Sequence, residues 1–270
     1  QHLAASSGGQ GGDLYYLDCQ SRSVQLKIYV KQRFIHLCFW STMMLTMVNG
    51  EHKSTKSKDR VRDQAEVFTA DREVTAMLDL VKNETERIDS RFLEPACGNG
   101  NFLAPILERK LAVVQRKYKR SQLEYERNVL IAIGSIYGVD ILEDNVEECR
   151  ERLYKIFEAA YMGLYKKKAH TNICLSAKAI LKRNIVWGNA LDLRTADPDN
   201  PEPIVFSEWS RPFNDSRIKR HDYDFEEVVT KDEPSLLKEH KVSDLGEKVF
   251  KVHPVKSYPL THISKIGELV

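Results

Sequence analysis

A carboxylate followed by two closely spaced glycines is the feature of this 270-residue chain that most directly indicates chemistry. Glu94, Gly98 and Gly100 lie in the segment 91–103, which reads RFLEPACGNGNFL. The segment begins apolar, passes the carboxylate and turns through the glycines into a helical pattern. Glycines permit a sharp turn and a close approach of a ligand to the backbone, and a helix N-terminus offers unpaired N–H groups to an anion. We therefore expect a strand, a ligand-binding loop and a helix start here.

The glycine spacing disfavours a dinucleotide site. The fingerprint G-x-G-x-x-G requires a third glycine, and Leu103 stands at its position. What remains is the pattern Glu94-x-x-x-Gly98-x-Gly100. An ordinary strand–turn–helix corner of an α/β domain is the alternative interpretation.

This pattern resembles motif I of the S-adenosylmethionine-dependent methyltransferases. Its wording, EPACGNGNFL, is most similar to the amino-group DNA methyltransferases of restriction–modification systems. The resemblance implies cofactor contacts from this segment through Glu94, Pro95, Ala96, Gly98, Gly100, Asn101 and Phe102.

The segment just upstream predicts one amphipathic helix. Its apolar face consists of Val74, Met77, Leu78, Val81, Thr85 and Ile88, and Thr69 or Asp71 can cap it. Placed directly before motif I, the segment resembles motif X of the gamma-class amino-methyltransferases, which lies over the methionine part of the cofactor. The resemblance assigns cofactor contacts to Phe68 and Thr69, although Ala70 stands where the family usually has proline.

Two helices are expected to follow motif I. The first has an apolar face formed by Leu103, Leu107, Leu111, Val114 and Tyr118. The second begins at a capping box, Ser121-x-x-Glu124, and ends at Gly134.

A short apolar strand with a carboxylate at its end comes next, at residues 136–141. In nucleoside-binding α/β folds, an acid at the end of the second strand accepts hydrogen bonds from the ribose hydroxyls. We assign that role to Asp140 and the adenine face to Ile141. The long separation from Glu94 implies an extra helix between the two strands. The alternative role of Asp140 is a helix cap, for which Asp144 is the better-placed residue.

The third strand and its loop, at residues 184–191, resemble motif III. The resemblance places Asn189, Ala190 and Leu191 near the adenine amino group. Asn189 stands where the family usually has aspartate, and its amide oxygen can still accept from the exocyclic amine. Trp187 belongs either to the core or to the wall of the cofactor cleft.

The fourth motif of amino-methyltransferases, (D/N)-P-P-(Y/F), is missing. That motif accepts hydrogen bonds from the target amine and stacks on a flipped base. After the next expected strand, 203–206, the chain offers only Ser207 and Glu208 as acceptors and Trp209 as a stacking ring. These three are weak candidates for catalytic residues, and a strand end with a packing tryptophan is the alternative.

Composition sets limits on partners. The net charge of +2 excludes a polycation, so nucleic-acid binding must use local patches, for which Arg217, Lys219 and Arg220 are a candidate phosphate contact. The five scattered cysteines contain no C-x-x-C pair, which indicates reduced thiols and no structural zinc.

The apolar run 34–48 is shorter than the roughly twenty residues that span a bilayer. We interpret it as a buried element or as sequence upstream of a natural start at Met47, and expect no membrane partner and a cytoplasmic location.

Together these patterns predict an α/β fold, a Rossmann-like methyltransferase domain whose mostly parallel sheet carries helices on both faces. We expect a poorly defined extension or linker over 1–60, the S-adenosylmethionine-binding domain over 61–210 and a C-terminal extension over 211–270.

The expected activity is adenine-N6 methylation of DNA in a restriction–modification system, with S-adenosylmethionine as cofactor and no metal. Three versions remain open. The chain is the cofactor-binding part of a split or truncated enzyme, or a self-sufficient methyltransferase with an unusual fourth motif or a non-DNA substrate, or a non-catalytic subunit. Its expected partners are DNA and a second methyltransferase, specificity or restriction subunit.

Overall fold

The computed structural model describes residues 71–226 and 253–269, and beyond them only the backbone of five strands. Those strands are β1 (Leu14–Leu17), β2 (Val24–Lys31), β3 (Phe34–Ser41), β10 (His240–Val242) and β11 (Lys248–Phe250). The predicted cofactor contacts at Phe68 and Thr69 lie outside the described residues.

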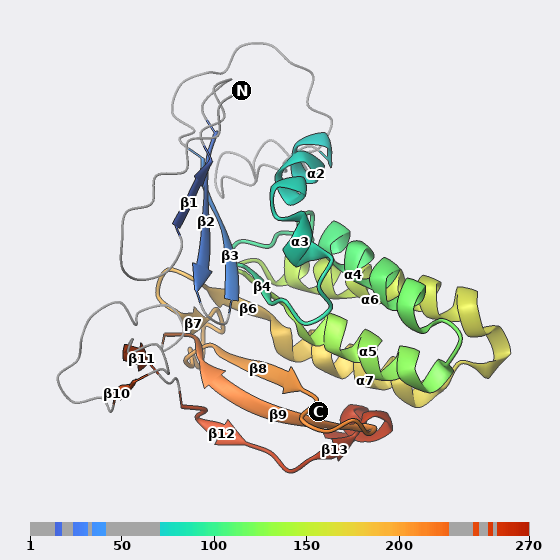
Figure 1. The fold of residues 1–270 in the computed structure, drawn as a ribbon. Helices are drawn as coiled ribbons and strands as arrows, with labels where there is room; N and C mark the ends of the chain where they lie inside the picture. The colour runs from blue at the N-terminus through green and yellow to red at the C-terminus, as the bar shows by residue number, and fades with distance from the viewer. Residues whose placement is uncertain are drawn as a thin grey trace.

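A seven-stranded mixed sheet, in the order β1 to β7, forms the centre of the fold (Figure 1). Its middle is parallel, because β3 pairs with β4, β4 with β5, and β5 with β6 in the same direction. Antiparallel pairs extend it at both sides. The remaining strands of this sheet are β4 (Phe92–Glu94), β5 (Ile136–Asp140), β6 (Ile185–Asn189) and β7 (Arg194–Thr195). The predicted parallel core is therefore confirmed for β4, β5 and β6.

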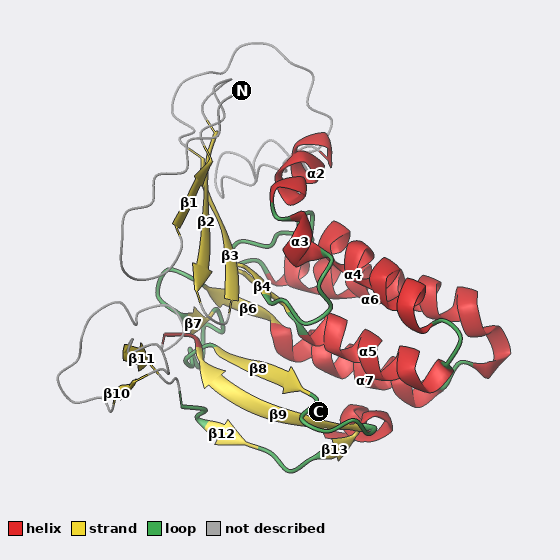
Figure 2. Cartoon of the chain, viewed as in Figure 1, coloured by secondary structure: helices red, strands yellow, loops and turns green. Residues whose placement is uncertain are grey.

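The described helices pack together on one face of this sheet (Figure 2). They are α2 (Asp71–Leu80), α3 (Lys82–Thr85), α4 (Leu103–Tyr118), α5 (Gln122–Gly134), α6 (Glu143–Tyr165) and α7 (Thr171–Asn184), with the short 3₁₀ helix η1 (Lys166–Lys168). Alternation along the strands directs Phe92, Ile136 and Ile185 toward the helices, where they join the main core.

The other face of β4 and β5 is covered by strands, so the expectation of helices on both faces is wrong for these described strands. Leu93, Tyr137 and Val139 point to that face and pack against Phe206 and Phe225. These come from a second, antiparallel sheet and the residues just after it. The second sheet contains β8 (Val205–Ser210), β9 (Arg217–Asp224), β12 (Lys256–Ser257) and β13 (Thr261–His262).

The expected strand at 203–206 is wrong in extent. β8 runs from Val205 to Ser210 and pairs antiparallel with β9, outside the parallel sheet. The expected domain boundary at residue 210 thus falls between two paired strands. The 3₁₀ helix η2 (Ile263–Leu269) then returns to the main core through Ile263 and Ile266.

Helix boundaries followed local signals in some places and not in others. The Ser121 side chain caps α5 by accepting from the Glu124 N–H at 3.4 Å, and α5 ends at Gly134, as predicted. The single helix expected up to Ile88 is instead broken at Val81 into α2 and α3. Asp144 does not cap α6, which begins one residue before it.

No helix in the described part of the chain is long and apolar enough to cross a membrane. Part of the apolar run 34–48 forms β3, whose backbone pairs with β4.

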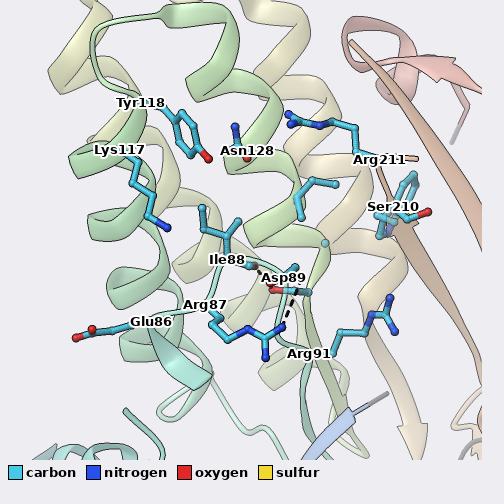
Figure 3. Close-up of a pocket in the computed structure, with 14 residues that line it drawn as sticks. Glu86, Arg87, Ile88, Asp89, Arg91, Lys117, Tyr118, Asn128, Ser210 and Arg211 are labelled. Atoms are coloured by element: carbon cyan, nitrogen blue, oxygen red, sulfur yellow. Dashed lines mark hydrogen bonds and ion pairs between the residues drawn. The ribbon is translucent and has the colours of Figure 1, made fainter. Parts of the chain in front are cut away.

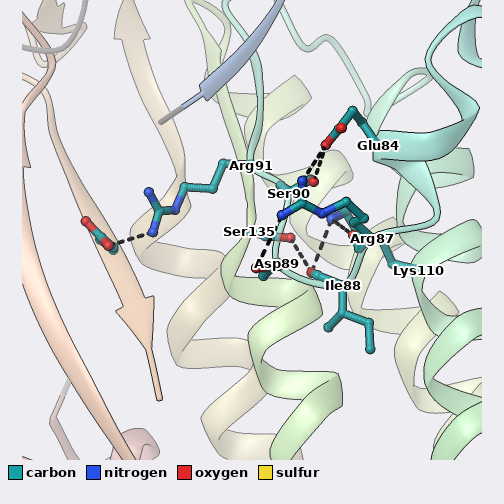
Figure 4. A network of polar contacts seen from close by, with 9 residues as sticks. Glu84, Arg87, Ile88, Asp89, Ser90, Arg91, Lys110 and Ser135 are labelled. Carbon is teal, nitrogen blue, oxygen red and sulfur yellow. Dashed lines mark hydrogen bonds and ion pairs between the residues drawn. The ribbon is translucent and has the colours of Figure 1, made fainter. Parts of the chain in front are cut away.

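A buried lysine fixes the chain just before β4. Lys110, on α4, is fully buried and its ammonium donates to the carbonyl oxygens of Arg87, Ile88 and Ser90 at 2.7, 3.2 and 2.6 Å (Figure 4). Ser135 adds a hydroxyl bond to the Ile88 carbonyl at 3.2 Å. These bonds satisfy carbonyls that have no place in a helix or strand. Burial lowers the pKa of Lys110 to about 7, despite the opposing influence of nearby carboxylates.

We expect Lys110→Met to lower the free energy of unfolding by about 2–4 kcal/mol, because it leaves buried carbonyls without a donor. The sign of the pH dependence follows from the lowered pKa. Below pH 7 the lysine is protonated in both states, whereas above it only the unfolded chain holds the extra proton, so stability rises with pH. The wild-type advantage over Lys110→Met should therefore grow by about 1 kcal/mol per pH unit between pH 7 and 8.5. Denaturant titrations of both proteins at several pH values measure this, and a pH-independent difference would contradict it.

Candidate functional site

The loop between β4 and α4 takes a backbone shape that depends on its two glycines. Gly98 and Gly100 have φ angles of 50° and 87°, in the left-handed region that favours glycine. At Gly100 there is also no room for a side chain, because an added Cβ would lie 2.9 Å from the Cys149 Sγ on α6. The Cys97 N–H donates to the Val139 carbonyl at 2.9 Å, which ties the loop to β5.

The Asp140 carboxylate at the end of β5 joins this loop to the next one. Its Oδ2 accepts from the Gly98 N–H at 2.8 Å, and its Oδ1 accepts from the Leu142 N–H at 2.9 Å and the Asn145 side-chain amide at 3.4 Å. The Leu142 bond ties the carboxylate to the residue just before α6, although no side chain caps that helix. A carboxylate offers about four acceptor positions, so these bonds leave about one for a ligand.

Two buried oxygen atoms next to the loop have no hydrogen-bond partner among the described residues. They are Oε2 of Glu94, at the end of β4, and Oδ1 of Asn99, between the two glycines. Burial raises the pKa of the Glu94 carboxyl well above its usual range, against one backbone hydrogen bond from Ala96 that lowers it. Buried acceptors without donors are uncommon in folded proteins, and a bound donor group is one way to satisfy them.

Apolar side chains are exposed at the same edge of the sheet. Ile141, directly after β5, is 58% exposed, and Leu191, just after β6, is 95% exposed. The Trp187 ring is half-buried, and its N–H donates to the Ile141 carbonyl at 3.0 Å. Asp140 of β5 is in register with Trp187 of β6, and Trp187 packs against the main core. Ile141 and Leu191 follow these neighbouring strands at the same edge of the sheet, and we call these two exposed residues the apolar rim.

Other predicted contacts are engaged within the protein. The Asn189 Oδ1, expected to meet the adenine amine, accepts from the Leu191 N–H at 3.0 Å and so closes its own turn. The Asn101 amide oxygen accepts from Arg152 at 2.8 Å, and Phe102 is buried in the main core. Pro95 and Ala190 are partly exposed, and Ala96 is exposed.

The weak catalytic candidates lie away from the glycine loop. Ser207 is buried, and its hydroxyl donates to Asp222 at 2.7 Å. Glu208 forms an ion pair with Arg91, just before β4, at 2.6 Å. Trp209 is buried, and its ring packs against Gly134, just before β5. Trp209 joins the main core on the helix face. The contacts with Arg91 and Gly134 place Glu208 and Trp209 toward the amino ends of the parallel strands, whereas the glycine loop follows the carboxyl end of β4.

The expected basic cluster is not a free cationic patch. Arg220 is 4% exposed and forms an ion pair with Asp222 at 2.7 Å. Arg217 pairs with Asp215 at 2.6 Å. The prediction that Arg220 could meet phosphate is therefore wrong, because alternation along β9 turns its side chain inward.

Asn99, Asn145 and Cys149 also shape the loop, through bonds to Glu148 and Asp140 and through the contact of Cys149 with Gly100, and none of the three was predicted as a site residue. The only sequence signal for them was their position, between the glycines for Asn99 and on the first turns of α6 for the others.

Comparisons of the chain with family models, with curated proteins and with solved structures found no match. No group of three or more His, Cys, Asp or Glu in the described ranges is arranged to hold a metal ion.

We expect Asp140→Asn to destabilise the chain even without a ligand. Replacing one acceptor oxygen by an NH₂ group leaves at least one N–H, from Gly98 or Leu142, without its charged partner. The expected loss is about 1.5–3 kcal/mol in a denaturant titration. Asp192→Asn is the matched control, because Asp192 also accepts from a backbone N–H and an asparagine amide but is exposed, and its loss should be under about 0.5 kcal/mol. Equal stabilities of wild type and Asp140→Asn would show that the carboxylate does not hold the loops.

Proposed function

We propose that the chain binds S-adenosylmethionine at the glycine loop and is the cofactor-binding part of a DNA adenine-N6 methyltransferase of the restriction–modification type. The observation that carries the proposal is the junction of the Gly98–Gly100 loop with the Asp140 carboxylate at the carboxyl ends of β4 and β5. Open α/β sheets bind nucleotide-like ligands at this edge. The helix-connected order β4, β5, β6 is the arrangement that a Rossmann-like methyltransferase domain requires, and we propose that fold for this part of the chain.

The described residues fit the cofactor. The unpartnered buried oxygens of Glu94 and Asn99 suit its amino and hydroxyl donors. The remaining acceptor position of Asp140 suits a ribose hydroxyl, and the apolar rim at Ile141 and Leu191 suits the adenine ring. Asn189 fits less well, because its acceptor oxygen closes its own turn.

The cofactor, when bound, supplies an electrophilic methyl group on a positively charged sulfur. The chain's own contribution is to hold this donor in one place and orientation, which for an in-line transfer supplies much of the acceleration. The leaving group already carries its activating charge, so the donor side needs no general acid or base.

The three residues predicted to bind the target amine do not form a site for it. Ser207, Glu208 and Trp209 are paired with Asp222, Arg91 and the main core. We propose that the acceptors for the target amine come from a partner polypeptide or from a segment beyond the described residues. DNA is then bound chiefly by that partner.

The first test is calorimetric titration of S-adenosylmethionine into the full chain. Ile141→Ser should weaken binding roughly fivefold, since it removes about 1 kcal/mol of apolar contact with the adenine. Leu123→Ser, at an exposed leucine on α5, is the matched control and should leave affinity unchanged. A folded wild-type chain that does not bind S-adenosylmethionine would overturn the proposal.

The second candidate, a non-catalytic cofactor-binding subunit, is favoured by the engagement of Ser207 and Glu208 in protein contacts. Transfer of labelled methyl from S-adenosylmethionine to DNA decides between the two. Transfer only after a partner methyltransferase subunit is added supports the split enzyme. Binding without transfer under both conditions supports the non-catalytic subunit.

A further inference from the structure

The fold also contains a cavity of about 540 Å³, and none of the residues that line it belongs to the glycine loop (Figure 3). Its walls come from three places: the chain before β4, the facing parts of α4 and α5, and the end of β8. All three lie toward the amino ends of the parallel strands. Its volume is within the range typical of small-molecule sites.

The wall before β4 is held rigidly. Lys110 and Ser135 bind the carbonyl oxygens of residues 87–90, and Arg91 is fixed by its ion pair with Glu208. The backbone of Ser210, at the end of β8, pairs with Lys219 of β9. This pairing fixes the chain just before Arg211, on the opposite wall of the cavity. A cavity bounded by such elements is already formed before a ligand arrives, so the ordering cost of binding is small.

Cations outnumber carboxylates among the residues that line the cavity. The cations are Arg87, Arg91, Lys117 and Arg211, and the carboxylates are Glu86 and Asp89. The Glu208 ion pair neutralises Arg91, and Arg87 lies 3.5 and 3.8 Å from Glu84 and Asp89. Arg211 has a longer ion pair, at 4.0 Å, with Glu124, which also pairs with Arg127. Lys117 and Arg211 are therefore the least neutralised cations of the cavity.

Arg211 has an unused donor inside the protein. Its Nη1 atom is buried and has no hydrogen-bond partner among the described residues. The nearest carboxylate oxygen, Oε2 of Glu124, is 4.0 Å away, too far for a hydrogen bond. The side chain of Lys117 makes no hydrogen bond or ion pair with another described residue. Figure 3 shows Lys117 and Arg211 on opposite sides of the same space.

Apolar and aromatic groups line the rest of the cavity. Ile88 and Ile131 form part of its wall, and the Tyr118 ring lies beside Lys117 (Figure 3). A ligand whose anionic group lies between Lys117 and Arg211 would therefore place its flat or apolar part against Tyr118. Arginine binds phosphate with paired, charge-assisted hydrogen bonds.

We propose that this cavity binds a small phosphorylated ligand of mononucleotide size, with its phosphate held by Lys117 and Arg211. A nucleic-acid backbone is disfavoured, because the exposed carboxylates Glu86 and Asp89 would repel the flanking phosphates and because the space is concave. The site is independent of the proposed methyltransferase function.

The test is titration of the full chain with inorganic phosphate, the four nucleoside 5′-monophosphates and the four nucleosides. Excess S-adenosylhomocysteine is present throughout, so that adenosine-containing probes do not report on the glycine loop. At least one monophosphate should bind about tenfold or more tightly than its nucleoside, the difference expected for charge-assisted phosphate contacts.

Arg211→Gln and Lys117→Gln should each remove most of that preference, and Lys155→Gln, at an exposed lysine on α6, should leave it intact. Lys117 is exposed, so its substitution tests the site even if Arg211→Gln disturbs folding. No preference for any monophosphate over its nucleoside, or an equal loss in Lys155→Gln, would overturn the proposal. Tighter binding of a duplex oligonucleotide through Lys117 and Arg211 would also overturn it, by assigning the cavity to a nucleic-acid backbone.

Discussion

The hydrogen bonds of the Asp140 carboxylate determine how the carboxyl edge of the sheet is built. One oxygen holds the Gly98 N–H and the other holds the Leu142 N–H, so a single side chain fixes both the glycine loop and the entry to α6. The loop cannot move without breaking a bond to a charged acceptor, which is stronger than a bond between neutral groups. The close fit of Gly100 against Cys149 adds a steric limit to the same arrangement. Every ligand contact proposed at this edge depends on that fixed geometry.

At the amino edge of the sheet, the chain is held by a different kind of interaction. There a buried ammonium, Lys110, collects three backbone carbonyl oxygens of a non-helical segment. The segment in turn forms one wall of the cavity that contains Lys117 and Arg211. The two edges thus carry separate polar centres, one built around an anion and one around a cation. A chain with two such edges has room for two ligands that do not compete for the same residues.

The second sheet has the strongest consequence for the proposed activity. β8 and β9 cover the face of the parallel sheet that helices were expected to cover, and they turn Ser207, Glu208 and Trp209 into structural contacts. Burial of Phe206 against Tyr137, with ring centroids 5.4 Å apart, fixes that placement. The proposed function therefore assigns only the donor side of the reaction to the described residues. The acceptor side would require groups from elsewhere.

Local patterns in the sequence were sufficient for the elements that depend on near neighbours. The apolar spacing of Leu103, Leu107 and Leu111 predicted α4, and Ser121 and Gly134 marked the limits of α5, because caps and helix faces involve residues only a few positions apart. The glycine loop was recognisable for the same reason. Long-range contacts decided the rest. No local signal shows that Asp140 binds Gly98 across 42 positions, that Lys110 reaches the carbonyls before β4, or that β8 pairs with β9 outside the parallel sheet. Such pairings depend on which buried groups find partners once the chain is compact, and only the tertiary structure supplies that information.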